Sequence, residues 1–221
     1  MPRPREFDEE TALEAAMRCF WASGYAATSM RDLGEAMRLG LASVYNAFGG
    51  KRALFTQCLD CYLNANMRAR IARLEAALPP GQAIETYLRD VVERALENRL
   101  GCMLVNVALE APRDPEIAGA VAARLAEMEA FFHRCAAAGQ RDGTISTEHD
   151  PSDIARLMLT TVMGLNVLAR GRPDRALLEG AVRLALAALG PANQTPAARL
   201  CDAPAPEGVD QTPQPPSHQE P

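Results

Sequence analysis

Hydrophobic residues recur along this chain at intervals of three and four, the spacing that places them on one face of an α-helix. Proline and glycine groups such as Pro79-Pro80-Gly81 and Gly190-Pro191 interrupt these repeats and mark the ends of helices. No strand pattern accompanies them. We therefore predict an all-α fold of about nine helices. The predicted helices cover residues 8–23, 29–37, 41–48, 52–78, 82–98, 102–110, 115–138, 151–171 and 173–189.

The second and third predicted helices are short, amphipathic and separated by a tight turn, which is typical of a helix-turn-helix. Ser29 suits the cap of the first of this pair, with Asp32 three residues later, as in a capping box. Helical spacing predicts buried faces of Met30, Leu33, Gly34 and Met37 in one helix and Leu41, Val44 and Phe48 in the other.

The third predicted helix presents small and hydrogen-bonding residues on its outer face. These are Ala42, Ser43, Tyr45 and Asn46. A short helix with such a face suits the major groove of DNA, where base edges offer donors and acceptors.

The run SVYNAFGGKRALF, residues 43–55, resembles the motif of the tetracycline-repressor (TetR) family of bacterial transcription regulators. Residues 13–20, 24–25 and 28–33 also resemble the first two helices of that family. The close match covers about the first quarter of the chain. One position departs from it, because Arg38 stands where the turn of the family usually carries glycine. Gly40 follows two residues later, which leaves the build of the turn and the first residue of the recognition helix open by one or two positions.

The resemblance implies two domains with different functions along the chain. Residues 1–52 would form a three-helix DNA-binding domain and residues 53–190 a helical effector-binding and dimerisation domain. The last two helices would build a two-fold homodimer, since one short helix reads too few base pairs. The implied function is a repressor that leaves its double-stranded operator DNA when a small-molecule or thiol-reactive inducer acts on the body.

Seven residues are candidates for DNA contact, and the resemblance places contacts at the same positions. Tyr45 and Lys51 are expected to reach backbone phosphates, which fixes register without reading sequence. Thr28 and Ser29, at a helix N-terminus, offer hydroxyl and backbone donors to a phosphate. Ala42, Ser43 and Asn46 are expected at base edges, and Asn46 suits adenine.

Charge limits how the molecule can bind nucleic acid. The formal net charge is −5, so the whole surface does not attract DNA. Residues 1–52 hold seven basic and seven acidic side chains, which leaves the DNA-binding part neutral and the remainder acidic. Arg3 and Arg5 precede the first helix and are either an arm that contacts DNA or a solvated terminus.

Cys102 is the candidate for effector sensing. It follows Gly101 at the expected start of a short helix, where the helix dipole stabilises a thiolate, and Arg99 lies nearby in sequence. The segment GCMLVNVALE resembles regulators of the same family that respond to N-ethylmaleimide, aldehydes or hypochlorite through one cysteine. The alternative is a small buried residue without chemistry.

The resemblance implies an inducer pocket in the remaining helices but does not identify the residues that line it. Met103, Met128, Phe131, Phe132 and Met158 are candidates for this lining, although such residues more often fill helical cores. Arg68, Arg70 and Arg73 are expected to face solvent at the far end of the fourth predicted helix.

The sequence offers little to an enzyme or a metal protein. It has no glycine-rich phosphate loop and no nucleophile elbow, and a Cys102–His133 pair lacks a third, orienting residue. Cys58 and Cys61 lie inside a helix, which argues against a redox motif. We expect no cofactor, no metal and no catalytic residue. A thiol-dependent enzyme and a protein-interaction module remain the alternative classes.

The two ends of the chain differ from its middle. No apolar run approaches the roughly 18 residues of a membrane span, and the first residues lack the apolar core of a signal peptide, so we expect a cytoplasmic protein. Residues 191–221 contain half of the prolines and few large apolar residues. This composition predicts a disordered tail, because it cannot bury enough surface to offset the entropy of ordering.

Overall fold

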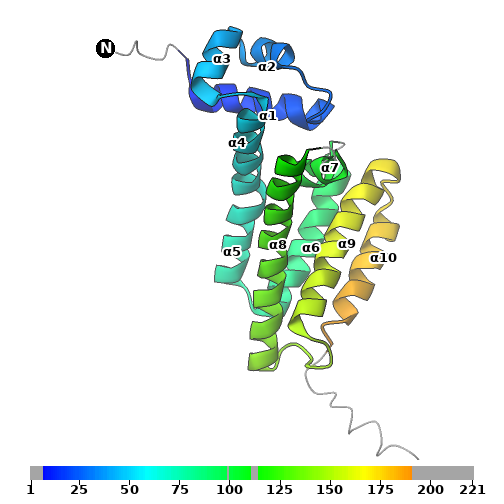
Figure 1. Cartoon of the computed structure of the whole chain (residues 1–221). Coiled ribbons are helices and arrows are strands. Elements are labelled where there is room, and N and C mark those ends of the chain that lie inside the picture. The colour runs from blue at the N-terminus through cyan, green and yellow to red at the C-terminus, as the bar shows by residue number, and fades with distance from the viewer. Residues whose placement is uncertain (1–6, 99, 111–113, 191–221) are drawn as a thin grey trace, which may run out of the picture.

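The computed structural model describes residues 7–98, 100–110 and 114–190. With α4, η1 and α5 counted as one continuous rod, these ranges contain nine helices and no strand, which confirms the predicted all-α fold. A small head formed by α1 to α3 lies above a bundle of longer helices (Figure 1). The elements are α1 (Glu9–Ser23), α2 (Met30–Met37), α3 (Leu41–Phe48), α4 (Lys51–Leu63), the π-helix η1 (Asn64–Arg68), α5 (Ala69–Ala77), α6 (Pro80–Glu97), α7 (Met103–Glu110), α8 (Pro115–Asp142), α9 (Pro151–Gly171) and α10 (Arg175–Ala187).

The head is held together by one small apolar core. Asp8 caps α1 as predicted, its carboxylate accepting from the Glu10 N–H at 3.1 Å. Phe20 meets Phe55 of α4 edge to face with ring centroids 5.1 Å apart, a favourable aromatic geometry. Burial of an aromatic pair across α1 and α4 fixes the head on the top of the rod. The other buried core residues of the head include Ala12, Ala16, Leu33, Met37, Val44 and Phe48.

The rod that connects the head to the body corresponds to the predicted helix 52–78. It begins at Lys51 and ends at Ala77, and the π-helix Asn64–Arg68 interrupts its regular α-geometry. Within this π-helix, the Asn66 side-chain amide donates to the Tyr62 carbonyl at 2.9 Å. Short π segments of this kind occur frequently at functional sites.

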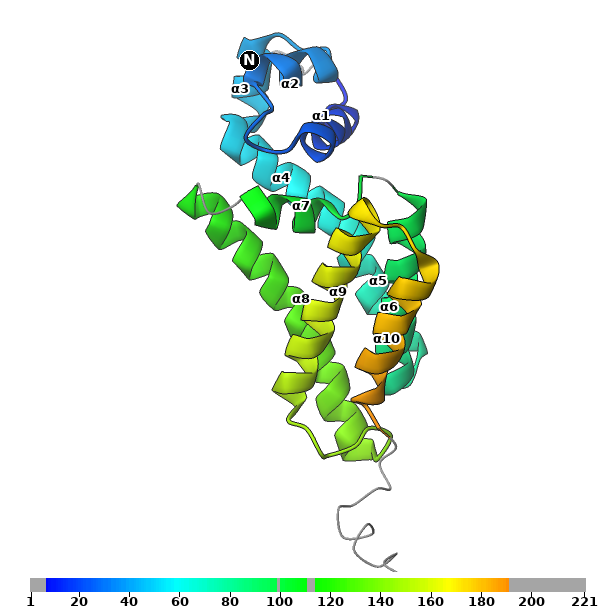
Figure 2. The ribbon, with the colours of Figure 1, turned by 90° about the vertical axis from the view of Figure 1, so that its right-hand side faces the viewer.

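The body consists of α6, α8, α9 and α10, which run alongside one another, with α7 lying across their upper end beneath the head (Figures 1 and 2). Its centre is an aromatic cluster of Tyr87, Phe131 and Phe132, whose ring centroids lie 5.0 to 5.4 Å apart. Met103 and Met158 are fully buried. These residues therefore belong to the core, which is the more ordinary of their two predicted roles.

Several predicted boundaries in the body are wrong by two to four residues, including the start of α6 at Pro80. The helix predicted to stop near Gly139 continues to Asp142, and Gly139 leaves room for Ile145 to fold back onto α8. A Cβ on Gly139 would lie 2.5 Å from Ile145 Cδ1. The helix ends at Gly143, which has a φ of 79°. The last helix begins at Arg175, two residues later than predicted, and is capped by Asp174.

None of the helices in the described ranges is both long enough and apolar enough to cross a membrane. The predicted tail, residues 191–221, lies outside the described residues.

Candidate functional site

The turn between α2 and α3 is built around Arg38. This residue adopts a left-handed conformation with φ 55° and ψ 39°, and its N–H donates back to the Glu35 carbonyl at 3.2 Å. The residue that departs from the family's usual glycine is therefore the left-handed residue of this turn. A left-handed conformation costs an L-residue about 1–2 kcal/mol. The recognition helix α3 begins at Leu41, with Gly40 as its N-cap.

The outer face of α3 carries the four residues assigned to it from the sequence. Ala42, Ser43 and Asn46 are exposed, and Tyr45 has 52% of its surface exposed. The predicted burial of Leu41 is wrong, since this side chain is 47% exposed. It belongs to the first turn of α3, beyond the edge of the small head core. An exposed leucine on this face can contact a thymine methyl group.

Thr28 does not offer a surface hydroxyl, contrary to the prediction. It is only 1% exposed, and its hydroxyl donates to the Gly24 carbonyl at 2.6 Å, which braces the loop after α1. Ser29 is exposed and forms the predicted capping box, accepting from the Asp32 N–H at 3.1 Å and donating its own N–H to the Asp32 carboxylate at 2.8 Å. The Ser29 backbone N–H, and after it the Ser29 side chain, lower the pKa of Asp32, because hydrogen bonds to its carboxylate stabilise the charged form.

Two cations of the head remain without an ion pair among the described residues. Arg31 and Arg52 pair with Glu35 at 3.0 Å and Glu116 at 2.9 Å. Arg38 has no such partner in these ranges and is exposed beside the N-terminus of α3. Lys51 Nζ donates to the Ala26 carbonyl at 3.4 Å and lies 4.5 Å from the centroid of the Tyr25 ring.

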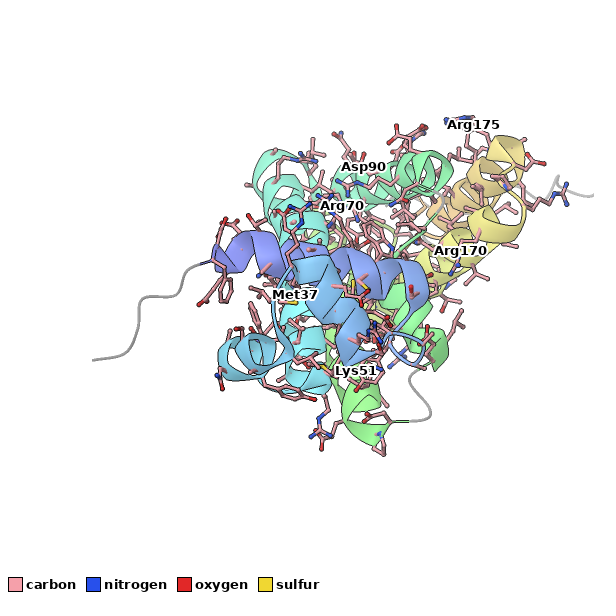
Figure 3. All side chains as sticks on the ribbon, turned by 90° about the horizontal axis from the view of Figure 1, so that it is seen from above. Met37, Lys51, Arg70, Asp90, Arg170 and Arg175 are labelled. Carbon is pink, nitrogen blue, oxygen red and sulfur yellow. The ribbon has the colours of Figure 1, made fainter. Side chains whose placement is uncertain are left out.

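Seen from above, Lys51 lies beside α2, on the same side of α1 as α2 and α3 (Figure 3). Arg38 is a candidate for DNA contact that the sequence reasoning treats only as a departure from a pattern. Its charge next to the recognition helix is the signal that could have found it. Arg3 and Arg5 lie outside the described residues.

A cavity of about 330 Å³ lies where the head, the rod and the body meet. Its size falls in the range of small-molecule sites, roughly 300–1,000 Å³. Side chains from α1, the rod, α6, α8 and α9 line it, together with the loop before α7. Of the five residues predicted to line a pocket, Met128 does so, whereas Met103, Phe131, Phe132 and Met158 are core.

Cys102 lies at the edge of this cavity, directly before α7. Its side chain is half-buried, and its carbonyl accepts from the Asn106 N–H at 3.0 Å. Burial raises the pKa of the neighbouring Tyr62, and the Cys102 thiol contributes in the same direction. Because Cys102 lines the cavity, a small molecule bound there can contact its sulfur. Arg99, the predicted neighbouring charge, lies outside the described residues.

Arg70 also lines the cavity, and its predicted exposure is wrong. The side chain is 8% exposed, and its guanidinium carbon lies 4.0 Å from the centroid of the Tyr87 ring. The view from above places it between the rod and α6 (Figure 3). Spacing alone would have found it, because Leu63, Met67, Arg70 and Leu74 follow one another at helical intervals of three and four.

Helix α7 and the loop before it connect the cavity to the head. In this loop, which lines the cavity, the Gly101 carbonyl accepts from Trp21 Nε1 at 3.2 Å. At the end of α7, the Glu110 carboxylate accepts from the Ala26 N–H at 3.1 Å. Gly24 makes room for this carboxylate, since a Cβ at Gly24 would lie 2.2 Å from Glu110 Oε1. A shift of α7 would therefore reach the loop between α1 and α2.

The last two helices expose large apolar residues. Leu184 of α10 is 79% exposed. Leu157, Val167 and Leu168 of α9 are exposed as well.

Comparisons with known proteins agree with this arrangement. A family model described as "Bacterial regulatory proteins, tetR family" matches residues 12–58, and one described as "Tetracyclin repressor-like, C-terminal domain" matches residues 82–185. The chain is 30% identical over 197 residues to the uncharacterized HTH-type transcriptional regulator YezE of Bacillus subtilis (strain 168), an alignment that covers 86% of this chain and 100% of YezE. It is 28% identical over 190 residues to the HTH-type transcriptional repressor ComR of Escherichia coli (strain K12), covering 83% of this chain and 88% of ComR.

Among solved structures, the chain is similar to a cysteine mutant of the TetR family transcriptional regulator CifR, complexed with a 26-base-pair double-stranded operator DNA. The TM-score is 0.76 and the sequence identity 35%, over 84% of this chain and 99% of that chain.

Proposed function

Because the chain belongs to the TetR family of bacterial regulatory proteins, we propose that this DNA-binding regulator is a repressor that an effector acting in the body cavity releases from its operator. The observation that carries the proposal is the outer face of α3, where Tyr45 and Asn46 are exposed and the cations Arg38 and Lys51, unpaired among the described residues, flank the helix. Cations of this kind supply most of the affinity for a phosphate backbone, and exposed side chains on the helix read the bases.

The proposed DNA contacts follow from this geometry. Tyr45, Lys51 and Arg38 contact phosphates, and Ser29 contributes its place at the N-terminus of α2. Ala42, Ser43 and Asn46 face base edges, with Leu41 added to them. The Thr28 side chain is left out, because its hydroxyl is committed to the Gly24 carbonyl. We keep residues 1–52 as the DNA-binding domain and residues 53–190 as the effector-binding and dimerisation domain.

A homodimer would supply the second head. The large apolar residues exposed on the neighbouring helices α9 and α10 support this part of the proposal, since contiguous exposed apolar surface marks interaction sites. A two-fold dimer would bind two half-sites on one face of the duplex. Leu184→Glu should then convert the dimer to a monomer in sedimentation experiments and abolish operator binding.

Helix α7 would couple the cavity to the head. An effector that fits the cavity better when α7 is displaced would favour one conformation of the dimer, and the Trp21–Gly101 and Ala26–Glu110 hydrogen bonds would carry that preference to α1 and α2. An effector shifts such an equilibrium only by its difference in affinity for the two conformations. Cys102, at the hinge between cavity and α7, is the proposed position of a thiol-reactive effector.

Binding of the purified protein to the DNA upstream of its own gene, at fixed moderate salt, tests the repressor proposal. We expect a sequence-specific complex that Tyr45→Ala weakens. Absence of any specific complex with this DNA would contradict the proposal. Treatment with N-ethylmaleimide should dissociate the complex of the wild type and leave that of Cys102→Ser intact. If both proteins respond equally, the sensor is not Cys102, and the half-buried Cys19 and Cys61 become the candidates.

A further inference from the structure

Arg70 is a buried charge without a counterion among the described residues. Its side chain is 8% exposed, and both Nε and Nη1 are buried without a hydrogen-bond partner in those ranges. Leaving an ion in this condition is costly, and buried charges in proteins are almost always paired. An arginine cannot escape the cost by losing its proton. The guanidinium is therefore a strong site for an anion that the described residues do not supply.

The rest of the cavity wall determines what kind of anion fits. Glu97 is the acidic residue of the lining, and it is exposed at the mouth and forms no ion pair with Arg70 in the part of the chain that the structure describes. A second cation, Arg94, lines the cavity and donates to the Asn66 carbonyl oxygen Oδ1 at 2.9 Å. The apolar residues of the lining include Met67 on the rod, Met128 on α8 and Val162 on α9.

We infer that the cavity binds a small amphipathic organic anion, with its carboxylate on Arg70 and its apolar part against α8 and α9. Arginine is well suited to this role, since its charge-assisted hydrogen bonds to carboxylates are short and strong. The stacking of the guanidinium on Tyr87 holds it in place before a ligand arrives, which limits the entropy lost on binding. The inference rests on the proposed function only where it calls this anion the effector.

The chain carries its own probe for the test, because Trp21 is its single tryptophan and lines the cavity. We would titrate the purified full chain with octanoate and follow Trp21 fluorescence. Octanamide and octanol serve as neutral ligands of the same length. The variant Arg70→Met removes the charge and keeps much of the volume. Arg73→Met is the matched control, since it changes an exposed arginine of the same helix.

The expected result is a saturable response to octanoate in the wild type and in Arg73→Met. Binding should be about tenfold weaker or more for octanamide, and for octanoate in Arg70→Met, because a buried charge-assisted hydrogen bond contributes at least the 1.4 kcal/mol that corresponds to a factor of about ten. The comparison of octanoate with octanamide needs no variant, so it decides the question even if Arg70→Met does not fold.

Three outcomes would overturn the inference: equal affinity for acid and amide, unchanged octanoate binding in a folded Arg70→Met, or no saturable response to any straight-chain carboxylate from butanoate to decanoate. Octanoate binding should also persist in Cys102→Ser, which separates reversible anion binding from thiol chemistry. A parallel DNA-binding assay tells the two proposals apart. Octanoate that binds but leaves operator affinity unchanged would uphold the anion site and contradict its role as the effector site.

Discussion

The head and the cavity both contain cationic side chains, but in opposite surroundings. In the head, Arg38 is exposed, and Lys51 is half-buried with its ammonium beside the Ala26 carbonyl and the Tyr25 ring, so neither cation is withdrawn from water. In the cavity, Arg70 is withdrawn from water and has no counterion within the described ranges. A surface cation gives a broad, salt-dependent attraction to any duplex, whereas a buried one gives a strong preference for a ligand that fits. Position in the fold, more than residue type, decides which of these an arginine provides.

The two regions also differ in how the chain builds them. The DNA-reading surface comes from one continuous stretch between residues 28 and 51, and two short helices fix its geometry. The cavity gathers residues from α1, the rod, α6, α8 and α9, which tertiary packing alone brings together. Substitutions in the head should therefore change DNA binding without disturbing the cavity. Substitutions in the head, in the cavity and at the joint between them test this independence.

The largest expected effect belongs to the head. Tyr45→Ala and Lys51→Ala should each weaken operator binding by about 1.5 kcal/mol per head, the lower end of the contribution of a hydrogen bond to a charged group. Since both heads of a dimer carry the change, this corresponds to about a hundredfold in affinity. Fluorescence anisotropy at several salt concentrations would measure it, and Lys51→Ala should lower the salt slope by about 1 for each phosphate that the lysine no longer neutralises. Unchanged affinity in both variants would show that α3 is not the DNA-reading helix.

The next largest effect is on the stability of the body. Arg70→Met should raise the free energy of unfolding of the ligand-free protein by roughly 1–4 kcal/mol, because it replaces a buried charge with an apolar side chain of similar length. Urea unfolding followed by circular dichroism would measure the change, with Arg73→Met expected within about 0.5 kcal/mol of the wild type. A marked loss of stability in Arg70→Met would instead mean that the guanidinium supports the fold and is not held ready for a ligand.

A smaller effect is expected at the α2–α3 turn. Arg38→Gly should stabilise the protein by about 1 kcal/mol, since glycine adopts the left-handed conformation without the Cβ penalty. The same substitution should weaken operator binding by removing a cation beside α3. Arg38→Ala is the control, because it removes the charge and keeps the Cβ, so affinity should fall without a gain in stability. If neither variant binds DNA less well than the wild type, Arg38 does not contribute to DNA binding and differs from the family's usual glycine only in its effect on the turn.

The smallest expected change in DNA affinity comes from the joint between head and body. Glu110→Ala removes the acceptor of the Ala26 N–H and should alter operator affinity by roughly 1 kcal/mol or less. Its main effect should be on coupling, so that the effector lowers operator affinity less than in the wild type. The ratio of operator Kd with and without effector measures this, and Glu179→Ala, an exposed carboxylate of α10, is the control. An unchanged ratio would show that the Glu110 contact of α7 does not couple the cavity to the head.

The head is predictable from sequence because its pattern is local. The capping box of Ser29, the buried Val44 and Phe48 and the exposed face of α3 all follow from spacing within a few residues. Spacing misplaces Leu41 because it assumes a core along the whole helix, and the head core ends before the first turn of α3. Sequence also misplaces Thr28, because a buried threonine whose hydroxyl satisfies a nearby carbonyl looks the same in sequence as an exposed one.

The cavity is less predictable, and for a different reason. Its members lie far apart in sequence, so no local pattern reports that they meet. Arg70 is the exception, since it continues the buried spacing of Met67 and Leu74. Its residue type instead favours a solvated position, because arginine is rarely buried without a partner. A charged residue at a buried register position is therefore an informative conflict between spacing and chemistry, and such conflicts concentrate at functional sites.

Lys51 gives the head an unusual chemical property. It is the single lysine of the chain, so its ε-amine is the sole side-chain target for amine-directed reagents. Reductive methylation with isotope-labelled formaldehyde would place one side-chain reporter beside Tyr25 and Ala26, at the loop where head and α7 meet. The NMR chemical shift of this labelled methyl group would then report both DNA binding and effector binding at one position, without any substitution in the chain.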